Sequence, residues 1–196
     1  MTNTFVAEGG EFATREARQT LLPRLVPFIG KCRAAGILVV FARQVLAADG
    51  SDAGSLDDIY PGRLAPFHAG GWGIEIYPEL DPQPADKVLD KPRFSAFHGT
   101  ALQGDLEALG IDTVIINSGS TAVGCESTAR DAASRDFKVI FTSDGTITRA
   151  LADSGWGAYT AEEVHHRTLA VLGHSLARIA SLDEIAREIQ QHAGSS

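Results

Sequence analysis

Apolar runs that alternate with helical patterns are the feature that most restricts how this chain can fold. Residues 37–42 (ILVVFA) and 112–117 (DTVIIN) are almost continuously apolar and rich in β-branched side chains, which is typical of strands buried on both faces. A helical stripe of apolar residues precedes the first run, over 25–32. Strands in alternation with helices predict an α/β fold, in which a mostly parallel sheet carries helices on both faces. We therefore expect a three-layer, Rossmann-like αβα arrangement.

The remaining elements follow the same alternation along the chain. We expect further strands at 87–90, 138–142 and 178–181, and further helices at 101–110, 123–135, 161–173 and from Asp183 onward. Residues 43–81 have no regular pattern, and a connection of that length often has a functional role. Residues 1–196 are expected to form one domain.

Composition excludes several classes of function. A net charge of −8 argues against sequence-independent binding of nucleic acid, which needs clustered Lys and Arg. No apolar run approaches the about 18 residues of a membrane span, and the start MTNTFVAEGG lacks the pattern of a secretory signal. The chain has only two cysteines, without a CxxC pair. We therefore expect a cytoplasmic protein with no membrane and no nucleic-acid partner.

The segment INSGSTAVGCESTARDAA (116–133) lies where chemistry collects in such folds, after the carboxyl end of a strand. Its GxxxxG spacing over 119–124 resembles a phosphate-binding loop, but Cys125 and Glu126 stand where Lys and Ser or Thr are required. Phosphate binding is therefore disfavoured.

Cys125 is either a small packed residue or a nucleophile. Cys32 lies on the apolar face of its predicted helix and is interpreted as core. Cys125 lies at a helix start behind a loop of small residues, where backbone N–H groups favour a thiolate and can hold an oxyanion. Lys91 ends the strand KVLD at the same edge, so its ammonium is expected to lower the pKa of the thiol.

Four motifs resemble the isochorismatase-like cysteine hydrolases, the superfamily of nicotinamidase, N-carbamoylsarcosine amidase, ureidoacrylate amidohydrolase and biuret hydrolase. They are DGSDAG (49–54), GGWGIEIYPEL (70–80), KPRFSAFHGTAL (91–102) and GSTAVGCESTARDA (119–132). The resemblance implies an Asp–Lys–Cys triad that hydrolyses a C–N bond through a thioester. Cys125 matches the nucleophile and Lys91 the lysine. The amides of Thr121 and Cys125 would form the oxyanion hole, with a cis peptide between Ser120 and Thr121.

The resemblance starts one residue after the family's catalytic aspartate. This sequence contains neither that aspartate nor the strand before it, which is the first strand of the family's sheet. We therefore expect a shortened N-terminus. Glu8 and Glu11 are the nearest carboxylates, and neither is expected to replace the aspartate.

The resemblance also bears on ligands. Nicotinamidases of the family bind a divalent ion through an aspartate and two histidines after the second strand. RQVLAADGSD (43–52) has no histidine there, so we expect neither a catalytic metal nor another cofactor. His165 and His166 in EEVHH lack the HExxH spacing and are expected on a solvated helix face. Residues in stretches that face the site in the family, each of which packing would explain at least as well, are Phe5, Gln44, Trp72, Phe94 and Phe97. Arg93 is expected either to pair with a substrate carboxylate or to be an ordinary surface arginine.

The expected function is hydrolysis of a small linear amide or carbamoyl compound through Cys125. The resemblance also implies a homo-oligomer. Two alternatives stay open: an inactive member that serves as a binding or structural protein, and an isochorismatase-type vinyl-ether hydrolase, in which loss of Cys125 would leave activity intact.

Overall fold

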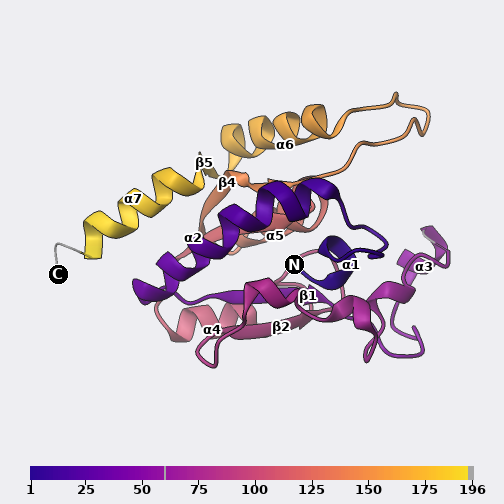
Figure 1. Ribbon diagram of the computed structural model, residues 1–196, viewed down its shortest axis with the longest axis horizontal. Coiled ribbons are helices and arrows are strands. Elements are labelled where there is room, and N and C mark those ends of the chain that lie inside the picture. The colour runs from indigo at the N-terminus through magenta and orange to yellow at the C-terminus, as the bar shows by residue number, and fades with distance from the viewer. Residues whose placement is uncertain (60, 194–196) are drawn as a thin grey trace.

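The computed structural model describes residues 1–59 and 61–193, which form an α/β arrangement (Figure 1). Its strands are β1 (Val40–Gln44), β2 (Lys87–Lys91), β3 (Thr113–Gly119), β4 (Lys138–Ile147) and β5 (Arg178–Ala180). Its helices are α1 (Asn3–Val6), α2 (Leu22–Ala34), α3 (Ser55–Ile59), α4 (Leu102–Ala108), α5 (Glu126–Ala133), α6 (Ala161–Ser175) and α7 (Leu182–Ala193). Every predicted strand and helix is confirmed, with boundaries that differ by a few residues.

The strands pair in parallel and lie in two sheets. β1 pairs with β2, and β3, β4 and β5 form the second sheet in that order. Within the described residues, β1 and β3 therefore each have a neighbouring strand on one side only. This corrects the expectation that both strands are fully buried, because in them only Phe41 and Ile116 are buried and the other residues keep partial exposure.

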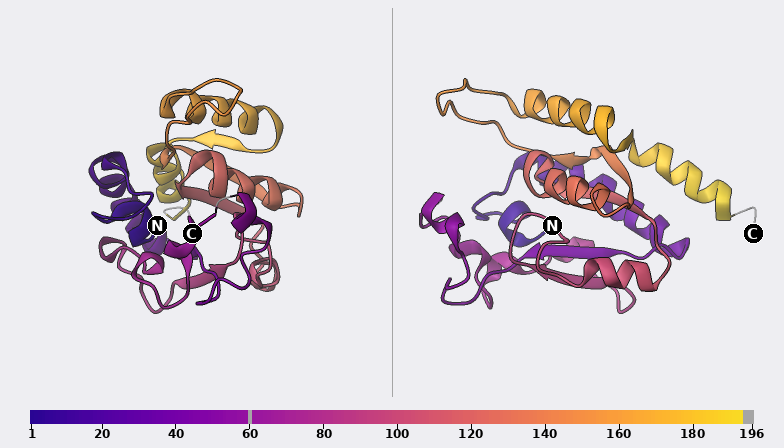
Figure 2. Two further views of the ribbon diagram at one scale, coloured as in Figure 1. Left: turned by 90° about the vertical axis from the view of Figure 1, so that its right-hand side faces the viewer. Right: turned by 180° about the vertical axis from the view of Figure 1, so that it is seen from behind.

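Helices cover both faces of the three-stranded sheet, as the predicted three-layer arrangement requires (Figure 2). On one face, Phe141 of β4 and Leu172 of α6 are fully buried in a cluster that includes Ala129 of α5. On the other face, Leu25 of α2 and Ile185 of α7 pack in a second cluster. Burial of each large side chain contributes about 1.5–3 kcal/mol, so these two layers stabilise the sheet from which the Cys125 turn leads.

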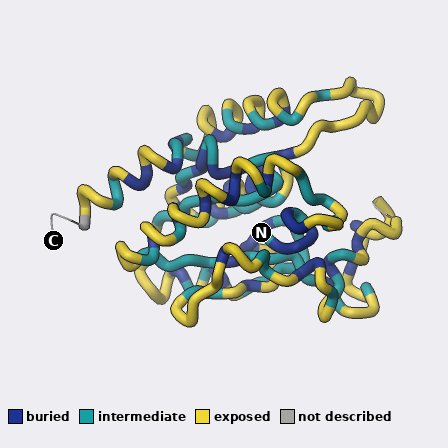
Figure 3. Tube along the Cα trace, in the orientation of Figure 1, coloured by how far each residue is buried: buried dark blue, intermediate teal, exposed yellow. Residues whose placement is uncertain are grey.

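Local signals explain where α6 begins. Thr160 accepts a hydrogen bond from the backbone N–H of Glu163, and the Glu163 carboxylate accepts one from the backbone N–H of Thr160, which is a capping box. The loop between β4 and α6 is largely exposed (Figure 3), and Trp156 within it is 86% exposed.

The irregular segment after β1 is folded against the molecule. It contains α3 and three short 3-10 turns, at Ala65–Phe67, Trp72–Ile74 and Pro78–Leu80. Leu46, Leu56 and Phe67 bury an apolar cluster of its own. In the described part of the chain, no helix has the length and apolar character needed to cross a membrane.

Candidate active site

Two parallel strands bring the predicted nucleophile and lysine to the same region. Lys91 is the last residue of β2. Cys125 is the last residue of a π-helical turn, Thr121–Cys125, that leads from β3 into α5. Both side chains are largely withdrawn from solvent, and the charge of each affects the pKa of the other. The fold therefore brings together the two residues that the motifs single out.

The turn before Cys125 differs in one detail from the expectation. The cis peptide bond lies between Gly119 and Ser120, one bond earlier than the predicted Ser120–Thr121 bond. Glycine has no Cβ, so it tolerates the close approach of successive Cα atoms across a cis bond. The Ser120 hydroxyl lies 2.8 Å from the Thr148 hydroxyl, and the Ser120 carbonyl accepts a hydrogen bond of 3.1 Å from the amide of Cys125.

The Cys125 amide is thus already hydrogen-bonded in this conformation. Thr121 is the first residue of the turn, a position at which the N–H has no intrahelical acceptor. The two predicted oxyanion-hole donors therefore differ. The Cys125 amide would have to break its hydrogen bond to Ser120 before it could bind a substrate oxygen, whereas the Thr121 amide has no hydrogen bond within the turn to break.

Burial dominates the chemistry of the thiol. It raises the pKa of Cys125 to about 12, while the Lys91 ammonium and the N-terminal ammonium act in the opposite direction. Lys91 therefore lowers the pKa of the thiol, as expected, but the net pKa lies above that of a free thiol and not below it. Loss of solvation around a buried thiolate outweighs the attraction of the nearby cations.

Lys91 is held by backbone carbonyls of the loop that follows it. Its ammonium donates hydrogen bonds of 2.8 Å to the Arg93 carbonyl and 2.9 Å to the Phe94 carbonyl. Burial lowers its pKa to about 8, and the charge of Cys125 opposes that shift. Near neutral pH, Lys91 is therefore poised to gain or lose a proton.

Hydrogen bonds join the lysine loop to the nucleophile helix. The Thr128 hydroxyl accepts from the amide of Ala96 at 3.1 Å and donates to the Gly124 carbonyl at 2.7 Å. The buried hydroxyl of Ser95 donates to the Asp131 carboxylate at 2.7 Å. These contacts fix the distance between the segments that carry Lys91 and Cys125.

His165 is the site neighbour that the sequence pattern missed. Its Nδ1 lies 3.0 Å from the hydroxyl of the fully buried Thr121, and its Nε2 lies 2.8 Å from the Ser143 carbonyl. The expected solvated face is correct for His166, which is exposed, and wrong for His165. The available signal was helical spacing, because His165 precedes the buried Thr168 by three residues.

The predicted substrate residues fall into two groups. The first group lies near Lys91. Gln44 is opposite Lys91 in the β1–β2 register, and Phe94, in the loop after Lys91, accepts a hydrogen bond from the Lys91 ammonium through its carbonyl. The Gln44 Nε2 atom is buried and has no hydrogen-bond partner among the described residues. Phe97 is instead a buried core residue that contacts Phe137, with ring centroids 5.5 Å apart.

The other predicted substrate residues have structural partners. The Arg93 guanidinium donates to the carbonyls of Pro92, at 2.7 Å, and Asp52, at 3.0 Å. Phe5 packs against Phe12 and Phe67, with ring centroids 5.8 and 6.0 Å apart. Trp72 is half-exposed.

The carboxylates near the N-terminus lie at the surface. Glu8 and Glu11 are both exposed, and Glu8 is 4.0 Å from Arg18. This position does not suit either carboxylate as a partner of the buried thiol.

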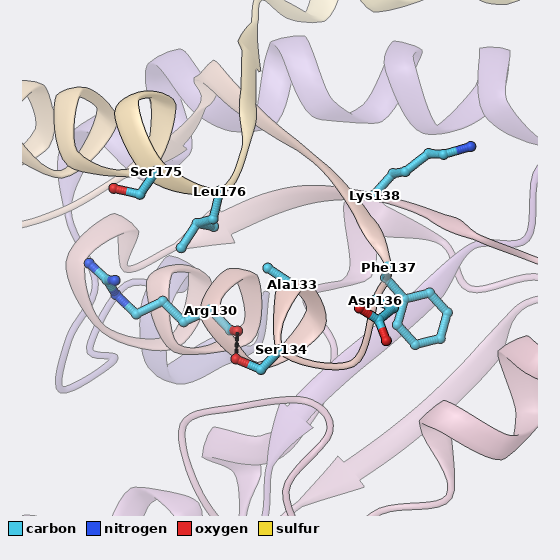
Figure 4. Close-up of a pocket in the computed structure, with 8 residues that line it drawn as sticks. All are labelled: Arg130, Ala133, Ser134, Asp136, Phe137, Lys138, Ser175 and Leu176. Atoms are coloured by element: carbon cyan, nitrogen blue, oxygen red, sulfur yellow. Dashed lines mark hydrogen bonds between the residues drawn. The ribbon is translucent and has the colours of Figure 1, made fainter.

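The described residues lack a cluster of metal ligands, and a surface hollow lies away from the candidate site. Among the described residues, no three His, Cys, Asp or Glu side chains converge on one point, so their arrangement does not fit a divalent ion. Figure 4 shows a surface hollow between the ends of α5 and α6, with Phe137 and Leu176 in its wall. Neither Cys125 nor Lys91 lines it, so this hollow is separate from the candidate site.

The fold and the buried pair of Cys125 and Lys91 describe an α/β protein of the cysteine-hydrolase class. Comparison with known proteins agrees, because the Isochorismatase domain family matches residues 1–184. The chain belongs to the isochorismatase family of hydrolases.

Three similar proteins illustrate the range of the family. The chain is 30% identical to nicotinamidase 3 of Arabidopsis thaliana over 86% of its own length and 79% of that protein. It is 31% identical to ureidoacrylate amidohydrolase RutB of Methylorubrum extorquens, over 74% of its own length and 66% of that protein. The crystal structure of a cysteine hydrolase from Pseudomonas syringae pv. phaseolicola superposes with a TM-score of 0.93, with 29% identity and coverage of 97% of this chain and 89% of the other.

Proposed function

We propose that this chain hydrolyses the carbon–nitrogen bond of a small linear amide or carbamoyl compound, with Cys125 as the nucleophile. The observation that carries the proposal is the pair of the buried Cys125 and the partly buried Lys91, in which each charge acts on the other. The names of two relatives, a nicotinamidase and a ureidoacrylate amidohydrolase, support an amide substrate. In this proposal residues 1–196 act as one catalytic domain.

The reactive form is the thiolate of Cys125 beside the ammonium of Lys91. The sulfur attacks the carbonyl carbon, and the carbonyl electron pair moves to the oxygen, which the Thr121 amide stabilises. Collapse of this intermediate breaks the C–N bond, and the leaving nitrogen takes a proton from Lys91. The products of this half-reaction are ammonia or an amine and a thioester on Cys125.

Hydrolysis of the thioester restores the starting state. Water adds to the thioester carbon and gives a proton to the neutral amine of Lys91. The C–S bond then breaks, which regenerates the thiolate and releases the acid. A lysine pKa of about 8 suits both steps, because an acid–base group works best when its pKa lies near the working pH.

The buried donor of Gln44 supports a substrate that presents an acceptor near Lys91. An unpaired buried N–H group is costly, at about 1–3 kcal/mol, so a substrate oxygen at this position would gain a partner that no described residue supplies. Amide, ureido and carbamoyl groups all offer such an oxygen.

Ammonia release from a panel of small amides, ureas and carbamoyl acids tests the proposal. Wild-type protein is compared with Cys125→Ala and with Cys32→Ala, the matched removal of the other buried cysteine. We expect release with wild type and Cys32→Ala and none with Cys125→Ala. Activity that survives Cys125→Ala would refute the cysteine mechanism, and turnover of a vinyl ether by that variant would identify the alternative hydrolase.

A further inference from the structure

The imidazole of His165 lies between two parts of the fold that flank the nucleophile turn. Its Nε2 is 2.8 Å from the carbonyl oxygen of Ser143 in β4, and its Nδ1 is 3.0 Å from the hydroxyl of Thr121. His165 comes from α6, so a single side chain connects this helix, the sheet and the first residue of the turn that ends at Cys125.

The partners determine where the ring proton lies. A backbone carbonyl only accepts hydrogen bonds, so Nε2 must carry the proton and donate to Ser143. In the neutral ring Nδ1 is then an acceptor, and the Thr121 hydroxyl donates to it. The result is a directed chain in which Thr121 donates to His165 and His165 donates to Ser143.

This chain fixes the orientation of Thr121. The Thr121 side chain is fully buried, and its hydroxyl hydrogen is used by His165. The Thr121 backbone amide begins the turn and is the donor that we assign to the substrate oxygen. Anchoring of the side chain from α6 restricts rotation of the residue, and with it the direction of that amide.

We infer that His165 is a positioning residue for the reaction, one that holds the Thr121 amide toward the developing oxyanion through the Thr121 hydroxyl. The inference rests on the proposed function. It assigns His165 no contact with the substrate and no part in proton transfer. A displaced oxyanion donor weakens stabilisation in the transition state more than binding in the ground state, so the expected effect falls on kcat and leaves KM nearly unchanged.

His166 provides a matched control. It is the next residue of α6, carries the same ring and is exposed. Replacement of either histidine removes one imidazole from the same helix, but only replacement of His165 breaks the chain from Thr121 to Ser143.

The test compares kcat and KM of His165→Leu, His165→Asn and His166→Leu, with active sites counted by alkylation of Cys125. We expect His165→Leu to lower kcat by roughly tenfold to a hundredfold with KM within about twofold, because small displacements at a reacting centre have effects of that size. His165→Asn keeps a polar group near the position of Nδ1 and should recover part of the loss. His166→Leu should behave as wild type. Equal kcat values for His165→Leu and His166→Leu would overturn the inference.

A double substitution separates positioning from a general loss of stability. Thr121→Val removes the hydroxyl and keeps the shape, so its kcat should fall by a similar factor, and adding His165→Leu should lower kcat little further. Multiplicative losses would show that the two residues act independently and would also overturn the inference.

Nitrogen NMR of the histidine side chains decides the hydrogen-bond arrangement without any substrate. We expect a proton on Nε2 of His165, a bare Nδ1, and a shift of the Nδ1 signal in Thr121→Val. A proton on Nδ1 in the neutral ring would contradict the chain. Wild-type protein without Cys125-dependent ammonia release would instead refute the proposed function, and with it the catalytic consequence of the chain.

Discussion

The pH dependence of Cys125 alkylation is the prediction that follows most directly from the buried pair. A pKa raised from 9.0 to about 12 implies a thiolate population at pH 7 lower by a factor of about 10³ than that of an ordinary thiol. Iodoacetamide should therefore react with Cys125 about 10³ times more slowly than with an exposed cysteine peptide at this pH. Below pH 8 the rate constant should rise tenfold for each pH unit.

Above pH 8 the rise should slow, although the thiol itself titrates much higher. Lys91, with a pKa of about 8, loses its proton first, so the pair passes into a singly protonated state. In this state the ratio of thiolate–ammonium to thiol–amine no longer depends on pH. Because the pKa of the thiol lies above that of Lys91, the thiolate–ammonium form is the minor one.

Two substitutions of Lys91 distinguish the effect of its positive charge from the effect of its deprotonation near pH 8. Lys91→Arg keeps a cation throughout this range, so the tenfold rise should continue past pH 8 without a break. Lys91→Met removes the cation, so it should also show no break and should react more slowly at pH 7. The base-10 logarithm of the factor lost at pH 7 should equal the width of the flat region in wild type, in pH units, since both measure the same interaction. A wild-type profile without a break near pH 8, in protein that melts normally, would refute the account of the pair.

Three further outcomes are expected. Gln44→Glu replaces the unpaired buried donor beside Lys91 with an acceptor and should raise KM at least fivefold, measured by steady-state ammonia release; an unchanged KM would exclude Gln44 from substrate binding. Trp72→Ala should change kcat/KM less than threefold, because the ring is half-exposed; a loss of a hundredfold would show that Trp72 contributes to the site. The folded state retains the Cys125 proton above pH 9, where the unfolded chain loses it, so stability should fall by up to about 1.4 kcal/mol per pH unit between pH 9 and 12 from this group. Cys125→Ala should lose this part of the dependence in chemical denaturation, and identical slopes would contradict the raised pKa.

Sequence patterns predicted the positions of helices and strands better than they predicted strand pairing and burial. The apolar stripe over 25–32 belongs to α2, whose buried residues include Leu25, Phe28 and Cys32. The strand predicted at 138–142 instead continues to Ile147, through SDGTI, which has no apolar pattern. Its later residues pair with the end of β3 after a shift of register, a long-range arrangement that local composition does not encode. The burial of β1 and β3 was overestimated for the same reason, because it depends on which strands pair.

The position of the site was more predictable than its electrostatics. Cys125 and Lys91 follow from the motifs and from their places after the carboxyl ends of strands, although β2 and β3 lie in different sheets. The direction of the thiol pKa depends on how deeply the side chain is packed, and no local pattern indicated that Cys125 would be almost fully buried. His165 was missed because EEVHH is a polar stretch, and its ring is enclosed only when α6 packs against the nucleophile turn.

Mass spectrometry can detect the proposed thioester on Cys125. The protein is mixed with a substrate that releases ammonia and is then quenched with acid, and the peptides that contain Cys125 and Cys32 are compared with and without hydroxylamine. The account predicts an acyl adduct on the Cys125 peptide alone that hydroxylamine removes, as expected for a thioester. Steady turnover with no adduct on Cys125 under conditions that trap a thioester, together with ammonia release by Cys125→Ala, would contradict it.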